Sequence, residues 1–142
     1  MQYRRSGDVI ALRLEPGEEV HASLAEAARQ SGISQAFVVS GIGHLHKVTL
    51  SYFIGKGEYA SSDFPEGGEL LSLAGNLVLK DGEPFFHLHA LLGRDNYSVF
   101  GGHLAAGVAD VTLEVMLLVV GDEVKMHREP DEATGLHALM ID

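Results

Sequence analysis

Alternating apolar and polar residues along much of the chain predict a domain built mainly of β-strands. Short runs of apolar and β-branched residues, bounded by glycine, proline or acidic residues, are typical of strands. Five such runs are Val9–Leu14, Ala36–Ile42, Lys47–Phe53, Leu70–Leu79 and Pro84–Leu92. We expect a turn at Gly41/Gly43 and a hairpin at Asp81-Gly82, a dipeptide that tolerates positive φ. Residues Gly55–Gly68, rich in glycine, serine and acidic residues, are expected to form a loop.

One segment has the period of a helix. Residues Glu18–Ser31 begin with acidic residues and precede Gly32, a residue type that commonly ends helices in the left-handed conformation. The apolar residues of this segment share one stripe: Val20, Leu24, Ala27 and Ala28. We predict the main helix here, at about residues 18–31, and a short further element at the C-terminus.

The most apolar segment, Val111–Val120, is apolar on both faces if it forms a strand. Its odd positions fill one face, and Met116 and Leu118 occupy the other. Such a strand must be covered on both sides, by the helix or by a neighbouring subunit. Many strands with few helices, joined by hairpin-like turns, predict an α+β domain with an antiparallel or mixed sheet.

Length and composition limit the chain to one globular domain, residues 1–142. A chain of 142 residues suits a single core, and 46% hydrophobic with 21% charged residues is the composition of a folded protein. The formal net charge is −10, and the ten lysines and arginines are dispersed. Because an acidic surface repels polyanions, nucleic acid is a disfavoured partner.

Cysteine is absent, which excludes disulfides, thiolate metal sites and cysteine nucleophiles. The N-terminus has no apolar segment of the kind that a secretory signal carries. The longest unbroken apolar run, Val115–Val120, is far shorter than the roughly 20 residues that span a bilayer. We therefore expect a soluble, cytoplasmic protein with no membrane partner.

Histidine must carry any metal chemistry, and two His-x-His pairs offer it. His87 and His89 lie in an otherwise apolar predicted strand. Residues i and i+2 of a strand share a face, about 6.6 Å apart, so two imidazoles can converge on one ion. Half-buried imidazoles need partners, and either a metal or ordinary hydrogen bonds would supply them. His44 and His46 have the same spacing but lie at a glycine-marked turn, where exposed polar residues are expected.

Two further residues extend the first pair. His103 follows Gly101-Gly102, and these glycines would let the backbone approach a bound ligand closely. A third histidine would complete an open metal site of the kind that catalytic zinc uses. Glu114 is the only charged residue within the most apolar strand, so it is either paired with an arginine or directed at a cation. It is the candidate base if the site is catalytic.

Five short segments, taken together and in order, resemble the PPC domain (plants and prokaryotes conserved). They are Val38–Gly43, Glu69–Asn76, His87–His89, Val99–Leu104 and Asp131–Leu136. The resemblance extends from about Val9 to Leu139. It implies an α+β domain that assembles as a homotrimer. In stand-alone prokaryotic members it further implies a divalent metal, usually zinc, held by histidines that match His87, His89 and His103.

The same family is labelled as predicted DNA-binding, and its plant members join the domain to AT-hooks. This chain has no Arg-Gly-Arg-Pro hook and no cluster of basic residues. Two hypotheses of different classes follow. The first is a metal-binding homotrimer whose open three-histidine site, with Zn²⁺ as the expected metal, binds or acts on a small molecule. The second is a DNA-binding or protein-interaction module with structural histidines. The sequence leaves open whether the protein is an enzyme.

Overall fold

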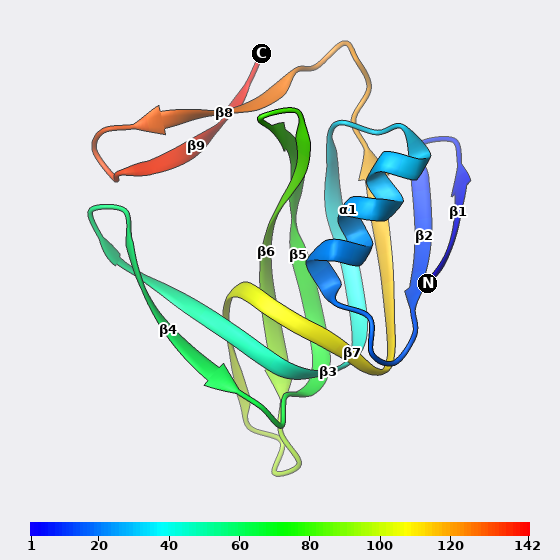
Figure 1. Ribbon diagram of the computed structural model, residues 1–142, viewed down its shortest axis with the longest axis vertical. Coiled ribbons are helices and arrows are strands. Elements are labelled where there is room, and N and C mark those ends of the chain that lie inside the picture. The colour runs from blue at the N-terminus through cyan, green and yellow to red at the C-terminus, as the bar shows by residue number, and fades with distance from the viewer.

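Nine strands and one helix make up the computed structural model, which describes residues 1–142 (Figure 1). The helix α1 is Val20–Ser31. The strands are β1 (Gln2–Ser6), β2 (Val9–Leu14), β3 (Ala36–Gly55), β4 (Glu58–Phe64), β5 (Gly68–Lys80), β6 (Glu83–Gly93), β7 (Val99–Val119), β8 (Met126–Asp131) and β9 (Leu136–Ile141). Seven of them form one antiparallel sheet in the order β1-β2-β7-β6-β5-β3-β4, and β8 pairs only with β9. The predicted α+β class is confirmed.

The long strands β3 and β7 hold the sheet together because each pairs with several partners. β3 pairs with β4, β5 and β7, while β7 pairs with β2, β3 and β6. Together with the β5–β6 ladder, these pairings close a ring of strands β3, β5, β6 and β7. Closure of this ring fixes the start of β7 against the end of β6, where the candidate metal ligands lie.

The helix forms as the apolar stripe predicts. Val20, Leu24, Ala27 and Ala28 are buried in one cluster with apolar side chains of the sheet. Gly32 ends the helix with a φ of 63°. The helix starts at Val20 instead of Glu18, because Glu19 is extended and its side chain accepts a hydrogen bond from the Ala22 N–H.

The expected turn at Gly41/Gly43 is wrong, because the two predicted strands are one bent strand, β3. Its pairing with β7 shifts register at several bulges, and Lys47 has a φ of 48°. A Cβ at Gly43 would lie 2.0 Å from the Thr112 carbonyl oxygen. Gly43 therefore allows a close approach of β3 to β7, and does not mark a chain reversal.

The expected loop at Gly55–Gly68 is also wrong, because residues Glu58–Phe64 form β4. This strand lies at the edge of the sheet and pairs with the second half of β3. Nearly all its side chains are exposed, so it has no apolar face to produce an alternating pattern. The edge strand β1 was missed for the same reason.

β7 is longer than the predicted strand Val111–Val120 and begins at Val99. Glycine and alanine residues in its first half hide the strand pattern. In its second half, the expected two apolar faces are present: Leu113, Val115 and Leu117 are buried, whereas Met116 and Leu118 remain 40% and 43% exposed. One apolar face of this strand is thus uncovered within the chain.

The predicted C-terminal element is a hairpin, β8–β9, which projects from the top of the sheet in Figure 1. The buried side chain of Gln35 anchors its base, donating to the carbonyls of Gly121 and Val124 and accepting from the Met126 N–H. The chain has no helix with the length and apolar character needed to cross a membrane.

Candidate metal centre

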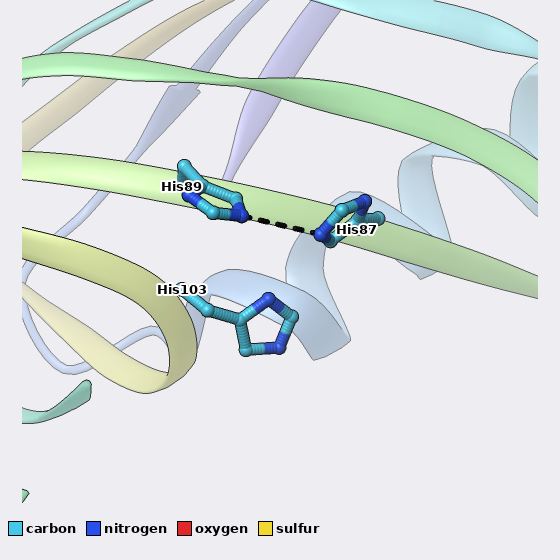
Figure 2. A group of neighbouring side chains, drawn as sticks. All are labelled: His87, His89 and His103. Carbon is cyan, nitrogen blue, oxygen red and sulfur yellow. Dashed lines mark hydrogen bonds between the residues drawn. The ribbon is translucent and has the colours of Figure 1, made fainter. Parts of the chain in front are cut away.

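Strand pairing brings three histidines together. His87 and His89 lie on β6, and His103 on β7 is directly opposite His89 in the ladder. One ring nitrogen of each residue lies within 4.8 Å of the corresponding nitrogens of the other two. Figure 2 shows the three rings turned toward one another. The predicted convergence of this His-x-His pair with His103 is what the structure contains.

The spacing of the nitrogens suits a tetrahedral metal. The Nε2 atoms of His87 and His89 are 3.2 Å apart. Two nitrogens bonded to zinc at 2.0–2.1 Å and a tetrahedral angle would be about 3.3 Å apart. In addition, Nδ1 of His103 is buried and has no hydrogen-bond partner. Donor type, spacing and this unsatisfied nitrogen all fit a metal ion held by the three rings.

Glycines set the backbone spacing that this convergence needs. A Cβ at Gly101 would lie 2.3 Å from the Ala90 carbonyl oxygen, and a Cβ at Gly75 would lie 1.9 Å from the His87 carbonyl oxygen. The expectation that Gly101 admits a ligand is therefore corrected, because this residue admits the backbone of β6. The two glycines let β5 and β7 pair tightly on either side of β6.

The site keeps two of its imidazoles neutral. Burial lowers the pKa of His87 to about 4, with further lowering by the positive charge of Arg128 and by His103 and His89. Burial is also the main cause that lowers the pKa of His103, and the neighbouring His89 and His21 lower it further. A metal binds neutral imidazole, so both rings are in the ligating form near neutral pH. Protons should therefore compete with a metal for His87 only at a lower pH than the ordinary histidine pKa of about 6.5 suggests.

Arg128, on β8, was not found by sequence reasoning. Its guanidinium donates from Nη2 to Oδ1 of Asn76 at 2.9 Å and to Nδ1 of His87 at 3.3 Å, and from Nη1 to the carbonyl of His137 at 2.8 Å. Burial lowers its pKa from the ordinary value. Arg128 lies 41 positions from His87, and no local motif links the two.

A cavity of about 230 Å³ lies over the histidines, between the sheet and the C-terminal hairpin. Its lining residues come from β4, the β5–β6 hairpin, β7 and β8–β9: Tyr59, Lys80, Phe85, His87, His103, Arg128, Leu136 and His137. None of them is acidic. The cavity reaches two of the three histidines, so a small molecule inside it can contact a metal held there.

The other candidate residues lie elsewhere. Glu114 is exposed on β7, opposite Arg13 of β2 and Ile42 of β3, and it is outside the histidine cluster. His44 and His46 place their Nδ1 atoms 3.2 and 3.8 Å from the carboxylate of Asp110, away from the other three histidines. The structure thus brings together only the first His-x-His pair and His103.

Comparison with known proteins identifies the domain. A model of the Plants and Prokaryotes Conserved (PCC) domain, the PPC domain, matches residues 1–121. The chain belongs to this family. The match ends before β8–β9, so Arg128 lies outside the segment that the family model describes.

Two curated relatives, from Synechococcus sp. strains JA-2-3B'a(2-13) and JA-3-3Ab, are each described as bifunctional protein GlmU. Each is 34% identical over 94% of this PPC chain. The chain spans 20% of the length of either relative, so the match identifies a shared domain.

Solved PPC structures share the whole fold. A PPC protein from Pyrococcus horikoshii is 34% identical, with a TM-score of 0.81, over 96% of this chain and 93% of its own. A protein from Archaeoglobus fulgidus described as metal-containing is 34% identical, with a TM-score of 0.84, over 99% of both chains. A protein from Bacteroides thetaiotaomicron, described as a candidate DNA-binding protein, is 24% identical, with a TM-score of 0.89, over 98% of this chain and 96% of its own.

We predict that removing the charge of Arg128 raises the pKa of His87. In the metal-free protein, NMR titration of the imidazole nitrogens should give a His87 midpoint near 4. Arg128→Met should move this midpoint upward but short of the ordinary value, because burial is the larger cause of the shift. Arg94→Met, which removes an arginine stacked on Phe100, should leave it unchanged. An unchanged midpoint in Arg128→Met would contradict the assigned cause.

Proposed function

We propose that this PPC protein is a homotrimer that binds one Zn²⁺ per chain through His87, His89 and His103, and that it uses the open coordination position for a small molecule. The observation that carries the proposal is the convergence of three ring nitrogens within 4.8 Å. The metal-containing relative from Archaeoglobus, 34% identical over 99% of both chains, supports it. Three protein ligands leave a fourth position open, as in catalytic zinc sites.

A bound zinc would supply a Lewis acid that polarises an oxygen ligand or acidifies a water. The chain's own residues define what reaches that position. His87 and His89 are held two residues apart by β6, and His103 is held by its cross-strand pairing. The cavity above them has room for a small molecule.

We predict that elemental analysis of the purified protein finds close to one metal per chain, with zinc as the expected ion. Imidazole also suits copper, iron and nickel, so the same measurement establishes which metal is bound. His87→Ala and His103→Ala should each remove most of the metal, because two imidazoles hold it far more weakly than three.

The matched control is His44→Ala, which removes a histidine of the same His-x-His spacing from the Asp110 side of the sheet. This variant should keep its metal. Loss of metal from His44→Ala with retention in His87→Ala would overturn the proposed site.

The proposed trimer rests on the uncovered apolar face of the sheet. Met116 and Leu118 on β7 are paired in register with Ala11 and Val9 of β2 on one side and with Ser40 and Phe37 of β3 on the other. Several large apolar side chains of these strands and of β5 and β6 are exposed: Val9, Phe37, Val39, Ile42, Leu71, Leu91, Met116 and Leu118. Large apolar side chains exposed together on one face are typical of a protein–protein interface.

We predict that Met116→Glu dissociates the assembly, because an unpaired carboxylate in a desolvated interface costs several kcal/mol, about 3–5 in comparable cases. Light scattering at micromolar concentration should give the mass of a trimer for the wild type and of a monomer for the variant. Ser34→Glu adds the same charge at an exposed position next to the helix and should remain trimeric. A monomeric wild type would refute the trimer.

The alternative function, binding of DNA, takes its support from relatives described as candidate DNA-binding proteins. The Bacteroides relative is 24% identical, which establishes a common fold only. The charge of this chain opposes the activity: a trimer would carry 3 × −10 = −30 formal charges. Nonspecific DNA affinity comes largely from lysines and arginines that displace counterions from the phosphates. In this chain, 20 aspartates and glutamates outnumber 10 lysines and arginines.

We predict weak or absent binding to duplex DNA near physiological salt. Fluorescence anisotropy of a labelled duplex, titrated at several salt concentrations, should show little change. Tight binding with a steep dependence on salt would favour the DNA hypothesis, because it requires a basic surface that several chains assemble together.

A further inference from the structure

The cavity over the histidines has an excess of positive charge. Its lining includes Lys80 and Arg128 and contains no aspartate or glutamate. A divalent metal on three neutral imidazoles would add two more positive charges. The whole chain carries a formal net charge of −10, so this local excess is opposite in sign to the charge of the protein. Lys80 is exposed and Arg128 is half-buried, so the cost of an uncompensated charge falls mainly on Arg128, and a bound anion would offset it.

Arg128 is positioned without a carboxylate partner. Its acceptors are a carbonyl of His137, the amide oxygen of Asn76 and Nδ1 of His87, none of which is anionic. Its Nε–H is buried and has no acceptor at all. A guanidinium has five N–H donors, so part of its capacity is unused. An arginine held in place with free donors is well suited to receive an oxyanion.

Metal binding would release a further donor of Arg128. A neutral imidazole carries one proton, on either Nδ1 or Nε2. The Nε2 atom of His87 faces His89, and its Nδ1 atom accepts from Arg128. If Nε2 binds the metal, the proton moves to Nδ1, which can no longer accept a hydrogen bond. The Nη2–H then needs another acceptor close to the metal.

Two hairpin tips meet next to Tyr59 and Leu136, which line the cavity. Gly57, between β3 and β4, lies against Gly135, between β8 and β9. A Cβ at Gly57 would lie 2.6 Å from the Gly135 carbonyl oxygen, and a Cβ at Gly135 would lie 2.8 Å from the Gly57 nitrogen. In Figure 1 the two hairpins approach each other at the left of the molecule. The cavity volume of about 230 Å³ has room for a small organic molecule.

We infer that this cavity is the binding site of a small carboxylate, which places its carboxyl group on Arg128 and a second oxygen at the open position of the metal. This inference rests on the proposed metal site and names the class of ligand that it takes. The planar fork of a guanidinium matches a carboxylate, and a neighbouring hydroxyl or carbonyl oxygen suits a metal with one open position. Small 2-hydroxy and 2-oxo acids combine both groups within the volume available.

The test is calorimetric titration of the zinc-loaded protein with glycolate and, in parallel, with glycolamide. The two probes have nearly the same size and differ in charge. Glycolate should bind, and glycolamide should bind at least tenfold more weakly. Arg128→Met should lower the affinity for glycolate about 10–100-fold, the range for hydrogen bonds to a charged group, while elemental analysis still finds one metal per chain. Arg94→Met removes the same charge from the stacked arginine outside the cavity and should bind glycolate normally.

The outcomes separate this inference from the proposed function. Equal binding of both probes, unchanged glycolate affinity in Arg128→Met, or binding of phosphate with no binding of glycolate would each overturn the carboxylate site and leave the metal site standing. If the wild type holds no metal, the proposed metal site fails. In that case, titration of the metal-free protein tests whether Arg128 binds a carboxylate without a metal. Glycolate should still bind more tightly than glycolamide, and equal binding would overturn the carboxylate site. Should Arg128→Met not fold, Arg128→Lys keeps the charge, removes the fork and should still weaken glycolate binding.

Discussion

The close approach of β6 and β7 is the constraint on which the site depends. Gly101 has no side chain because its Cβ would collide with the Ala90 carbonyl, and the ladder that this permits places His89 opposite His103. His87 follows on the same face two residues away. The three-histidine cluster therefore results from backbone pairing, and no flexible loop is needed to assemble it. If the cluster binds the proposed metal, its ligands would be held in place before the metal arrives.

The distribution of charge separates the surface from the site. The chain is acidic overall, whereas the cavity presents Arg128, Lys80 and three imidazoles without a carboxylate. A negative surface discourages nucleic acid and other polyanions at a distance, where the net charge dominates. A small anion that reaches the cavity meets positive charge at short range, where individual contacts outweigh the net charge of the chain. The same chain can thus repel long polyanions and retain a small one.

Sequence reasoning succeeded where one element carries its own signal. The stripe of Val20, Leu24, Ala27 and Ala28 located the helix, and the His-x-His spacing in an apolar strand located two members of the histidine cluster. It failed where the signal lies in another element. β4 pairs with the backbone of β3 and has no apolar face that a sequence pattern could show. Gly43 is typical of a turn in the sequence, and only the structure shows that it is needed because β3 passes close to the Thr112 carbonyl. Arg128 reaches His87 only through the C-terminal hairpin, a tertiary contact that no periodicity encodes.

Arg128 and the proposed metal would share the imidazole of His87, and this would link metal binding to anion binding. Without metal, Nδ1 of His87 accepts from Arg128, and the guanidinium is satisfied by neutral acceptors alone. A metal on Nε2 would remove that acceptor and would place a second positive centre close to the first. It would bind at the expense of a hydrogen bond and against electrostatic repulsion, and an anion bound to Arg128 would relieve both. Metal and anion should therefore strengthen each other's binding, by the same factor in each direction, as thermodynamic linkage requires.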